Sequence, residues 1–491
     1  MISNDLRCWL EEIEKMGELK RIEGAHWDRE IGAISELMAE RHGPALLFDK
    51  ISGYPQGHRV LSNAFLSLSR TASLLGIPQG LSEIQMVDAW RKRLKAVQRI
   101  SPVEVKTGEV KQNILTGKDV DLFKFPTPIW HELDGGRFIG TGCAVVTKDL
   151  EEGWVNLGTY RCRIFDKNLM SVSINPGKHG TMMMEKYHRQ GKSFPVAVAC
   201  GMDPCLFLAA CSPLTGWGES EYEFAGYIKG EPIQVMPGEV TGLPVPATAE
   251  IVIEGEIPPP GQMEKRLDGP FGEWRRVYSS SPFPLVEVKS IMYRDDPILL
   301  GVSPQKMHVP FPFAIPVMAA EIWNVLEYAG IPDVRGVWFG LGLVWPVFLV
   351  VSIKQSYAGH AKQAALAAAS CRANTVGGLF VIVVDDDIDI TNEKDVMWAI
   401  ASRANLDNIQ IIRGIPTKAG SSQKAAAAGE ERVLVNDRVI IDACWPYERR
   451  NGFPVTSRFN PQYEKEIMKK WHSLFERVAV EDRTASSGLA F

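Results

Sequence analysis

Residues 155–165, VNLGTYRCRIF, alternate apolar and polar side chains in the way that predicts a half-buried β-strand. Two polar positions are unusual for such a strand, because Asn156 brings an amide and Arg161 a guanidinium, with Gly158 between them. Side chains five positions apart leave opposite faces of an ideal strand. The segment therefore predicts a β-rich domain and raises the question of what these two groups face.

The sequence on both sides of this strand is also rich in short segments with β-strand character. From about residue 110 to 310, short β-rich runs alternate with turns that contain Gly and Pro, and one helix is expected at 181–191. Such spacing is typical of a barrel or sandwich core.

The chain before and after the β-rich part is predicted to mix helices and strands. Periodicity predicts an amphipathic helix at 316–329 that would join two domains, and a buried strand that ends at the acids 385–387. The fold class is therefore α/β, or α+β. Asp28 and Ser82 are predicted N-caps, and the other expected elements are helices at 5–17, 28–42, 67–76, 82–99 and 393–403 and a strand at 44–51.

Composition excludes several classes of function. The chain has 491 residues and a formal charge of −5, which gives no electrostatic reason to expect a nucleic acid or an anionic membrane as partner. The N-terminus contains acids from Asp5 onward and does not resemble a signal peptide. The uncharged run 337–353 contains glycines and a proline and is interpreted as buried strand. Eight cysteines without a CxxC pair are typical of a reducing cytoplasm.

Three potential metal ligands lie in the β-rich part. Asn156, His179 and Glu221 supply an amide oxygen, an imidazole nitrogen and a carboxylate, which suit a borderline-hard ion such as Mn²⁺. With one negative charge among its ligands, the ion would stay positive and could anchor a phosphate, to which Lys178 and Lys354 could add charge. Spacing alone leaves ordinary structural roles open for all three ligands, such as a turn histidine and a glutamate at a helix start.

A second set combines one arginine with two acids. In LDGPFGEWRR, Asp268 and Glu273 lie on either side of a turn whose glycines permit both carboxylates to reach one side. Arg161 between them would make charge-assisted hydrogen bonds and hold one acid ionised. If the other acid is buried, it could donate a proton near neutral pH. The alternative is an Arg–acid pair that only stabilises a β-turn.

The order of short phrases along nearly the whole chain resembles the UbiD-type decarboxylases, which use prenylated FMN. No single phrase is decisive, but their number makes chance similarity improbable. The phrases include GPALLFDKISGY (43–54), DVDLFKFPTPIWHELDGGRFIGTG (119–142), WVNLGTYR (154–161), PVAVACGMDP (195–204), SEYEFAGYIKGEP (220–232), DGPFGEW (268–274) and IKQSYAGHAKQAA (353–365).

The resemblance implies a cofactor site made of the residues already singled out. Asn156, His179 and Glu221 would bind Mn²⁺, which holds the phosphate of prenylated FMN, and a K⁺ site would share Glu221 with the backbone at Trp154. A flavin cavity lined by Asn156 and Arg161 requires a bulge or twist near Gly158. The residues expected to contact the cofactor are Asn156, Gly158, Thr159, Tyr160, Arg161, Lys178, His179, Glu221 and Lys354.

The resemblance also implies an activity, the reversible non-oxidative decarboxylation of an aromatic or α,β-unsaturated carboxylic acid. Arg161 would hold the substrate carboxylate, Glu273 would donate the proton that replaces CO₂, and Asp268 would hold Arg161. A flavin prenyltransferase would supply the cofactor. Implied domains are a cofactor-binding domain 1–315 (α/β portion 1–110, split β-barrel 111–315), a linker helix 316–330 and an oligomerisation domain 331–491 of a homodimer or hexamer.

Two departures from the family pattern keep alternatives open. Asp268 stands where many relatives have Glu, so its shorter side chain would reach Arg161 only if the turn moves inward. Arg275 and Arg276 follow the expected proton donor; they are either solvated or a contact for a second anionic group on the substrate. The alternatives are therefore an aromatic acyl-CoA or diacid as substrate, or a silent scaffold subunit of a larger carboxylase.

Other polar residues are interpreted as structural. His131 and Asp134 resemble metal ligands, but we favour a structural or domain-contact role. The acids 385–387 are expected to be solvated and to cap the following helix, and His360 is expected near a helix start.

Overall fold

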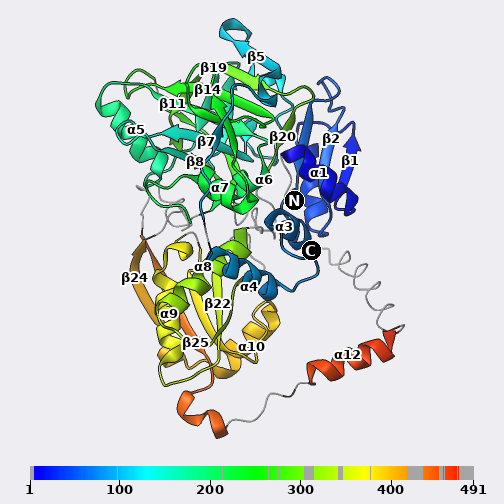
Figure 1. The fold of residues 1–491 in the computed structure, drawn as a ribbon, viewed down its shortest axis with the longest axis vertical. Coiled ribbons are helices and arrows are strands. Elements are labelled where there is room, and N and C mark those ends of the chain that lie inside the picture. The colour runs from blue at the N-terminus through cyan, green and yellow to red at the C-terminus, as the bar shows by residue number, and fades with distance from the viewer. Residues whose placement is uncertain are drawn as a thin grey trace. The chain divides into compact units, whose positions relative to one another are not determined.

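The computed structural model describes residues 5–474 apart from positions 97, 213, 264, 274–276, 303–313, 341–346, 376, 417–434, 453–456, 458 and 473. Residues Met1–Cys444 form one compact unit and Trp445–Phe491 a second one. The first unit mixes helices and strands, as expected for the α/β or α+β class (Figure 1). The expected loop at 419–429 and Arg275 and Arg276 lie outside the described residues.

The N-terminal portion is a small sheet flanked by helices. Its strand order is β1 (Leu19–Glu23), β2 (Ala45–Asp49), β3 (Arg59–Ser62) and β20 (Ile298–Leu300), so a strand from far along the chain completes it. The expected helices are present as α1 (Leu6–Lys15), α2 (Glu30–Ala39), α3 (Leu68–Leu75) and α4 (Glu83–Leu94). Ser82 caps α4 in a full capping box with Gln85, as its position predicts.

The predicted cap of α2 is wrong. Asp28 does not cap the helix; Arg29 occupies the N-cap position with φ 65° and makes no side-chain cap. The carboxylate of Asp28 binds the guanidinium of Arg29 instead, at 2.9 Å. Glu30 turns back and accepts from the amide of His26, which precedes the helix, at 2.7 Å, and as an acid in the first turn it interacts favourably with the helix dipole.

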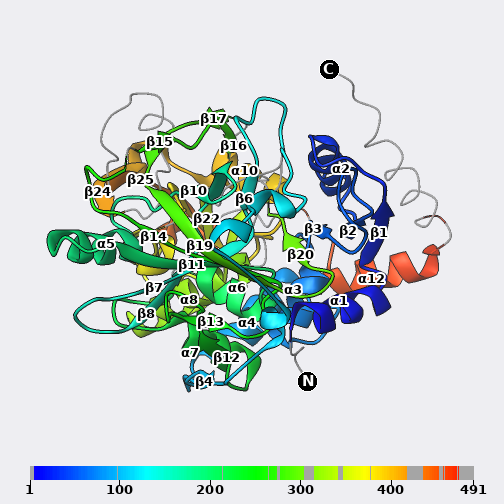
Figure 2. The same cartoon turned by 90° about the horizontal axis from the view of Figure 1, so that it is seen from above.

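The β-rich part is a nine-stranded antiparallel sheet that Figure 2 shows from above. Strand order places β8 (Val155–Gly158) at one end and β9 (Cys162–Asp166) second from the other end, although only three residues join them. Because so short a link spans little more than 10 Å, the sheet must curl until its two ends approach. The strand order is β6 (Phe138–Gly140), β9, β10 (Leu169–Val172), β19 (Leu285–Tyr293), β14 (Ile251–Ile257), β11 (Phe194–Cys200), β7 (Cys143–Lys148) and β8, and β5 (Asn113–Thr116) pairs with β19.

The expectation of one strand over 155–165 is therefore wrong. The strand ends at Gly158, and residues 159–161 belong to neither sheet edge. The strand is interrupted here and not merely bulged. The side chains of Asn156 and Arg161 therefore need not point to opposite faces of one strand. A Cβ at Gly158 would lie 2.5 Å from the ring of Tyr160, so a larger residue here would require that ring to move.

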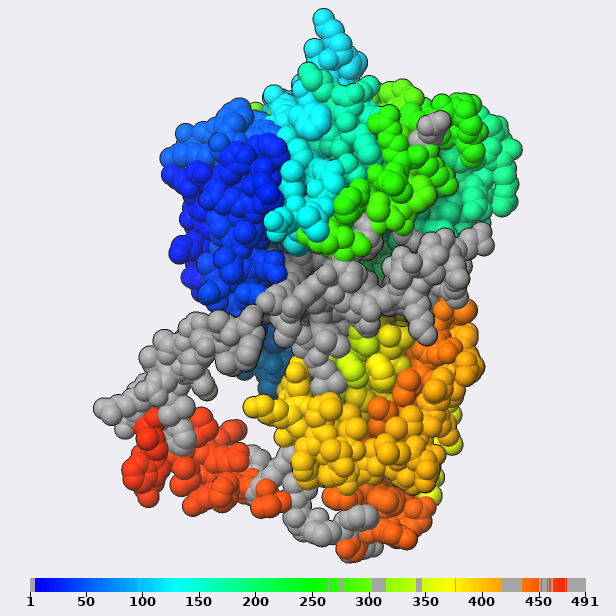
Figure 3. All heavy atoms as spheres, turned by 180° about the vertical axis from the view of Figure 1, so that it is seen from behind, coloured from blue at the N-terminus to red at the C-terminus, as the bar shows by residue number. Residues whose placement is uncertain are grey.

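Three helices and several short strands accompany the curled sheet. Helix α5 (His179–Arg189) contacts β7, β8 and β11 and lies beside the sheet in Figure 2. Helices α6 (Pro204–Cys211) and α7 (Glu221–Lys229) pack on each other. The segment around β5 protrudes from the surface in Figures 1 and 3. The short strands are β4 (Val103–Glu104), β12 (Gln234–Pro237), β13 (Pro244–Pro246), β15 (Arg266–Leu267), β16 (Phe271–Glu273), β17 (Val277–Ser279) and β18 (Pro282–Phe283).

The C-terminal portion of the first unit is a five-stranded mixed sheet. Its order is β21 (Val334–Gly340), β22 (Phe348–Ile353), β23 (Phe380–Asp385), β25 (Val435–Ala443) and β24 (Gln410–Pro416). The run 337–353 is thus buried strand, as predicted, but divided between β21 and β22, with 341–346 outside the described residues. The helix expected at 316–329 is present as α8 (Ala314–Tyr328).

Helices cover both faces of this sheet. Leu349, Val351 and Ile353 join a core that includes α8 and α9 (His360–Ser370), whereas Val350 joins a core with α10 (Glu393–Arg403). This alternation explains the uninterrupted apolar run in β22, because both faces of the strand are buried. In the second unit the longest described helix is α12 (Pro461–Lys470).

The prediction for the acids 385–387 is wrong in part. Asn392 caps α10, not one of these acids. Asp387 binds the buried guanidinium of Arg403 through both oxygens, at 2.6 and 2.7 Å, and Asp385 binds it at 3.1 Å. The acids are thus partners of an arginine that the end of α10 brings to the sheet. His360 begins α9, as predicted.

Candidate active site

A cavity lies where the strand 155–165 is interrupted. The C-terminal end of α6 and the N-terminal ends of α5 and α7 converge on it. The two N-terminal turns carry backbone N–H groups that have no partner within their own helix, which favours an anion nearby. It is lined by Asn156, Leu157, Gly158, Thr159, Tyr160, Gly177, Lys178, His179, Ala210, Cys211, Ser212, Thr215 and Glu221.

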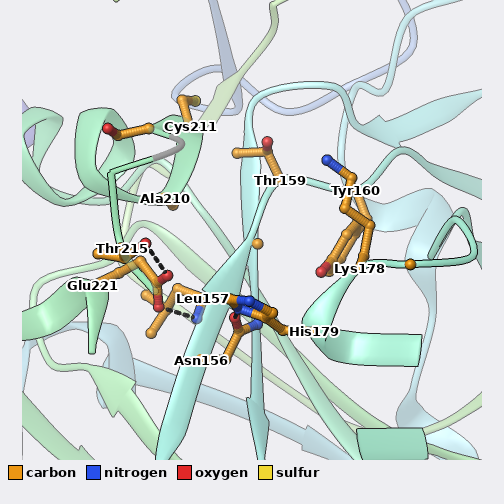
Figure 4. A pocket seen from close by; sticks show the side chains of 13 residues that line it. Asn156, Leu157, Thr159, Tyr160, Lys178, His179, Ala210, Cys211, Thr215 and Glu221 are labelled. Atoms are coloured by element: carbon orange, nitrogen blue, oxygen red, sulfur yellow. Dashed lines mark hydrogen bonds between the residues drawn. The ribbon is translucent and has the colours of Figure 1, made fainter. Parts of the chain in front are cut away.

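The three expected metal ligands come together in this cavity, as Figure 4 shows. Oδ1 of Asn156 lies 3.0 Å from Nδ1 of His179. The amide nitrogen of Asn156 donates to Thr147 at 3.3 Å, which turns the amide oxygen toward the histidine. At this distance the Nδ1–H tautomer of His179 donates a hydrogen bond to Oδ1 of Asn156, and the deprotonated ring nitrogen and the same oxygen could bind one cation in place of that proton.

Glu221 completes the set from the first turn of α7. It is 3% exposed, and its two oxygens accept hydrogen bonds from the amide of Leu157 at 2.8 Å and from Oγ1 of Thr215 at 2.6 Å. A carboxylate has about four lone-pair sites on its two oxygens, so these hydrogen bonds are compatible with a carboxylate that also binds a cation. Among the described residues no three His, Cys, Asp or Glu side chains form a metal cluster; the set here has two of these plus an amide. Its donor chemistry fits Mn²⁺.

Two tryptophans enclose the histidine. The rings of Trp154 and Trp217 both meet the His179 ring edge to face at 5.5 Å, and they contact each other at 5.1 Å. The carbonyl of Trp154, the expected K⁺ ligand, accepts from the amide of Asp149 at 2.9 Å and keeps its second lone pair.

Lys178 gives the cavity a positive charge. It precedes α5 and makes no side-chain ion pair or hydrogen bond with any described residue. Burial lowers the pKa of its ammonium to about 8. An anion bound beside it would relieve that cost, and the first amides of α5 would add to the attraction. Burial raises the pKa of the neighbouring Tyr160 hydroxyl, so this group is a neutral donor.

Arg161 and Asp268 form a second cluster that does not line this cavity. Oδ2 of Asp268 accepts from Nη2 of Arg161 at 2.9 Å, from its Nε at 3.2 Å and from the hydroxyl of Ser173 at 2.9 Å. The guanidinium also lies over the rings of Phe271 and Phe138, 4.8 and 5.8 Å from their centroids. Asp268 thus reaches Arg161 despite being one methylene shorter than Glu.

Two further residues expected in the site are Glu273 and Lys354. Glu273 is the last residue of β16, three residues after Pro270, but its side chain is outside the described part of the structure. Lys354 is exposed just after β22, donates its amide to Asp333 at 2.9 Å and does not line the cavity. The geometry therefore gives no support to a phosphate contact from Lys354.

Three residues that orient these groups are absent from the predictions made on sequence. Thr147 fixes the amide of Asn156, Thr215 binds Glu221, and Ser173 binds Asp268. Each is a hydroxyl in an unremarkable local sequence, and its partner lies between 6 and 95 positions away. Only the fold brings them together, so no signal along the chain identifies them.

Family models match three successive parts of the chain. Residues 10–90 match the N-terminal domain of 3-octaprenyl-4-hydroxybenzoate carboxy-lyase (UbiD), 101–307 its Rift-related domain and 313–443 its C-terminal domain. The chain belongs to the UbiD family. It is a carboxy-lyase of the UbiD type. The resemblance noted in the sequence is thereby confirmed.

Relatives within the UbiD family are similar over most of the chain. The pyrrole-2-carboxylic acid decarboxylase of Pseudomonas aeruginosa is 33% identical over 425 residues, which cover 82% of this chain and 83% of that protein. The vanillic acid decarboxylase of Sedimentibacter hydroxybenzoicus, solved in an open form, has a TM-score of 0.80 at 26% identity, with 97% of this chain and 100% of that chain covered.

A third relative was solved with flavin. The UbiD-class enzyme HmfF of Pelotomaculum thermopropionicum, in complex with FMN, has a TM-score of 0.79 at 26% identity, with 94% of this chain and 98% of that chain covered. An evolved dimeric form of HmfF in complex with prFMN has a TM-score of 0.76 at 25% identity, with the same coverage. In the UbiD chain described here, no helix within the described ranges is long and apolar enough to cross a membrane.

Proposed function

We propose that this UbiD-type carboxy-lyase uses prenylated FMN to decarboxylate an aromatic or α,β-unsaturated carboxylic acid in a reversible, non-oxidative reaction. The observation that carries the proposal is the convergence of Asn156, His179 and Glu221 on one cavity beside Lys178. The relatives named for pyrrole-2-carboxylic acid and vanillic acid support an aromatic substrate.

Asn156, His179 and Glu221 would hold Mn²⁺, and Glu221 with the carbonyl of Trp154 would hold K⁺. The cofactor phosphate would bind next to Lys178 and the first amides of α5, with Gly158, Thr159 and Tyr160 along the same wall. The cavity encloses about 100 Å³, less than the roughly 300–1,000 Å³ of typical cofactor sites, so it suits the phosphate end rather than a whole flavin. Lys354 remains a weaker candidate for phosphate binding.

The chain's own residues would position the substrate and move the proton. When bound, prenylated FMN supplies an electrophilic ring that accepts the electrons released as CO₂ departs. Arg161 attracts the substrate carboxylate, and Asp268 with Ser173 fixes the direction of the guanidinium. Glu273 gives its proton to the substrate carbon that has lost CO₂, and in the reverse direction removes it.

We also propose a domain role for each of the two large sheets and for α8. The curled nine-stranded sheet would be the split β-barrel that binds the flavin, α8 the linker, and the five-stranded sheet the core of an oligomerisation domain in a homodimer or hexamer. A flavin prenyltransferase would supply the cofactor. The boundaries expected from sequence, 1–315, 316–330 and 331–491, stay predictions.

No observation on the described residues favours an acyl-CoA or diacid substrate, because Arg275 and Arg276 lie outside them. The assignment as a carboxy-lyase sets aside the silent scaffold.

The test is to produce the protein together with a flavin prenyltransferase and to assay a panel of aromatic and α,β-unsaturated acids for CO₂ release. We expect His179→Ala to lose manganese and the absorbance of the modified flavin together, because it removes one ligand of the anchor. Glu273→Gln should keep both and lose roughly 10²–10⁴-fold in turnover, the usual contribution of a general acid. A flavin content unchanged in His179→Ala, or turnover near normal in Glu273→Gln, would contradict the proposal.

A further inference from the structure

The two acids of the candidate site belong to one short segment, residues 267–273, that is held almost entirely by other parts of the chain. Its N-terminal half is tied by Arg163, whose Nη1 donates to the carbonyls of Leu267 at 3.1 Å and Gly269 at 2.7 Å. Its C-terminal half ends in β16, for which the described strands offer no partner besides the three residues of β17. A strand pair of this length is not stable by itself, so the position of Glu273 depends on what else contacts β16.

The contact comes from the loop that follows Trp130, residues 131–136. The side chain of Asp134 is fully buried, and its Oδ1 accepts from the amide of Gly272 at 2.9 Å. Its Oδ2 accepts from the amides of Trp130 at 3.2 Å and His131 at 3.0 Å. One carboxylate therefore closes its own loop with one oxygen and holds the residue before Glu273 with the other.

The loop and the acid segment also fit closely. A Cβ on Gly272 would lie 2.8 Å from Nδ1 and 2.9 Å from Cγ of His131, so the imidazole packs directly on the backbone of β16. The amide of Gly135 donates to the carbonyl of Pro270 at 2.6 Å. The amide of Leu133 donates to the hydroxyl of Tyr278 on β17 at 3.1 Å. The loop thus contacts both strands of the pair.

The charges near Asp134 are consistent with a purely positional role. Nδ1 of His131 lies 3.5 Å from Oδ2 of Asp134, and the His131 ring meets Phe271 edge to face at 6.1 Å. The carboxylate is directed at backbone amides and not at the guanidinium of Arg161, which Asp268 holds. Asp134 thus acts on the backbone of the strand that carries Glu273.

We propose that Asp134 is a positioning residue for the reaction: it sets the place of the proton donor Glu273 by binding the amide of Gly272 and packing His131 against β16. This inference rests on the proposed function, in which Glu273 donates the proton. A misplacement of a reacting group by about 1 Å can cost on the order of 10²-fold in rate, so the effect should be measurable.

Asp134→Asn is the sharpest variant. It keeps the volume of the side chain, but one of the two oxygens becomes an NH₂ group that cannot accept, so either Gly272 or the amides of Trp130 and His131 lose their acceptor. Asp121→Asn is the matched control, because Asp121 also accepts from an amide within its own loop, that of Phe123 at 2.9 Å, without a bond to the acid segment.

The experiment is a double-mutant cycle on the holoenzyme with Asp134→Asn, Glu273→Gln and the combined variant, assayed with the best acid of the panel. We expect Asp134→Asn to lower kcat by roughly 10–100-fold with KM changed less than about threefold, manganese and flavin absorbance unchanged, and Asp121→Asn near normal. In the Glu273→Gln background the further loss should be below about threefold, because the group being positioned is gone.

An equal loss from Asp134→Asn in both backgrounds would overturn the inference and leave a general structural role. Near-normal turnover of Glu273→Gln would refute the proton donor itself and this inference with it, so the two failures are distinguishable. If Asp134→Asn does not fold, Gly272→Ala takes its place in the cycle, since the added methyl group would push β16 away from His131. The same non-additivity is expected there, and additive losses would equally overturn the proposal.

Discussion

Asp268 holds Arg161 through a single carboxylate oxygen, which accepts three hydrogen bonds, two of them from the guanidinium. Its other oxygen, Oδ1, is buried and has no hydrogen-bond partner among the described residues. The carboxylate therefore contributes both charge and direction to the arginine. Glutamate, common at this position among relatives, is not required for this contact.

We predict that Asp268→Asn lowers kcat/KM by roughly 10–100-fold, because a hydrogen bond to a charged partner is worth about 1.5–3 kcal/mol. Ser173→Ala removes only a bond from a neutral hydroxyl to the same oxygen and should cost less, about 2–10-fold. Steady-state kinetics of CO₂ release measures both. Equal losses in the two variants would show that the charge of Asp268 does not matter.

Lys178 and Lys354 were both expected at the cofactor phosphate, and the structure separates them. Lys178 lines the cavity, whereas Lys354 is exposed away from its lining. We predict that Lys178→Met weakens FMN binding by about tenfold or more, because a charge-assisted contact to phosphate is lost. Lys354→Met is the matched control and should change the affinity little. Fluorescence titration of the apoprotein with FMN measures both, and a larger effect at 354 would reverse this assignment.

At the scale of elements, helix N-termini determine much of the local structure. Helices α5 and α7 begin at His179 and Glu221, so the same turn that starts each helix also delivers a candidate ligand. Helix α1 is capped by Asp5, whose carboxylate accepts from the amide of Cys8 at 2.8 Å and from Arg294 at 2.8 Å. Asp5 thus caps α1 and ties it to the end of β19.

The hydrogen bonds of Asp5 with Cys8 and Arg294 predict a pH-dependent contribution to the stability of the folded protein. Burial alone would raise the pKa of Asp5, but the hydrogen bonds from Cys8 and Arg294 lower it overall. A lowered pKa in the folded state stabilises the protein above the unfolded value, about 3.9, and the contribution is lost as the pH falls below it. Asp5→Asn keeps a good N-cap but not the charge, so it should cost about 1 kcal/mol at pH 7.

The measurement is the difference in thermal midpoint between wild type and Asp5→Asn at pH 7 and near pH 3.5. We expect a lower midpoint for the variant at pH 7 and a smaller difference at the acidic pH. A difference that is the same at both values would mean that the ionised carboxylate contributes nothing. Glu14→Gln is the control, since Glu14 binds Arg21 in an exposed pair that is worth little.

At the scale of the whole molecule, every residue of the cavity and of the Arg161–Asp268 cluster lies in the first compact unit, Met1–Cys444. The five-stranded sheet is complete when β25 ends at Ala443, and, within the part of the chain that the structure describes, the members of the three hydrophobic cores extend to Cys444. The first unit therefore contains the cavity, the Arg161–Asp268 cluster and these cores within its own residues.

We predict that a chain that ends at Cys444 still binds manganese and prenylated FMN with the absorbance of the full-length protein. Its circular dichroism should show the same melting transition, because the buried apolar surface of the first unit is kept. Size-exclusion chromatography with light scattering would report separately whether the oligomer changes. A folded truncated protein without flavin would contradict the prediction.

Much of the fold was predictable from local sequence. The helices α1, α3, α4 and α10 and the buried strands β2 and β23 follow from apolar periodicity and capping residues, which act over a few positions. The cap of α2 and the partners of Asp385 and Asp387 were predicted wrongly, because Arg29 and Arg403 bind acids to which local rules assign a capping role.

The sequence alone determined the elements, the β-rich middle of the chain and the residue types able to bind a metal, a phosphate and a carboxylate. Tertiary structure decided that the strand through Asn156 and Arg161 stops at Gly158, and that Asn156 meets His179 and Glu221 while Arg161 turns to Asp268. The reason is that local propensities act over a few residues, whereas these contacts depend on a sheet of nine strands curling until its ends meet.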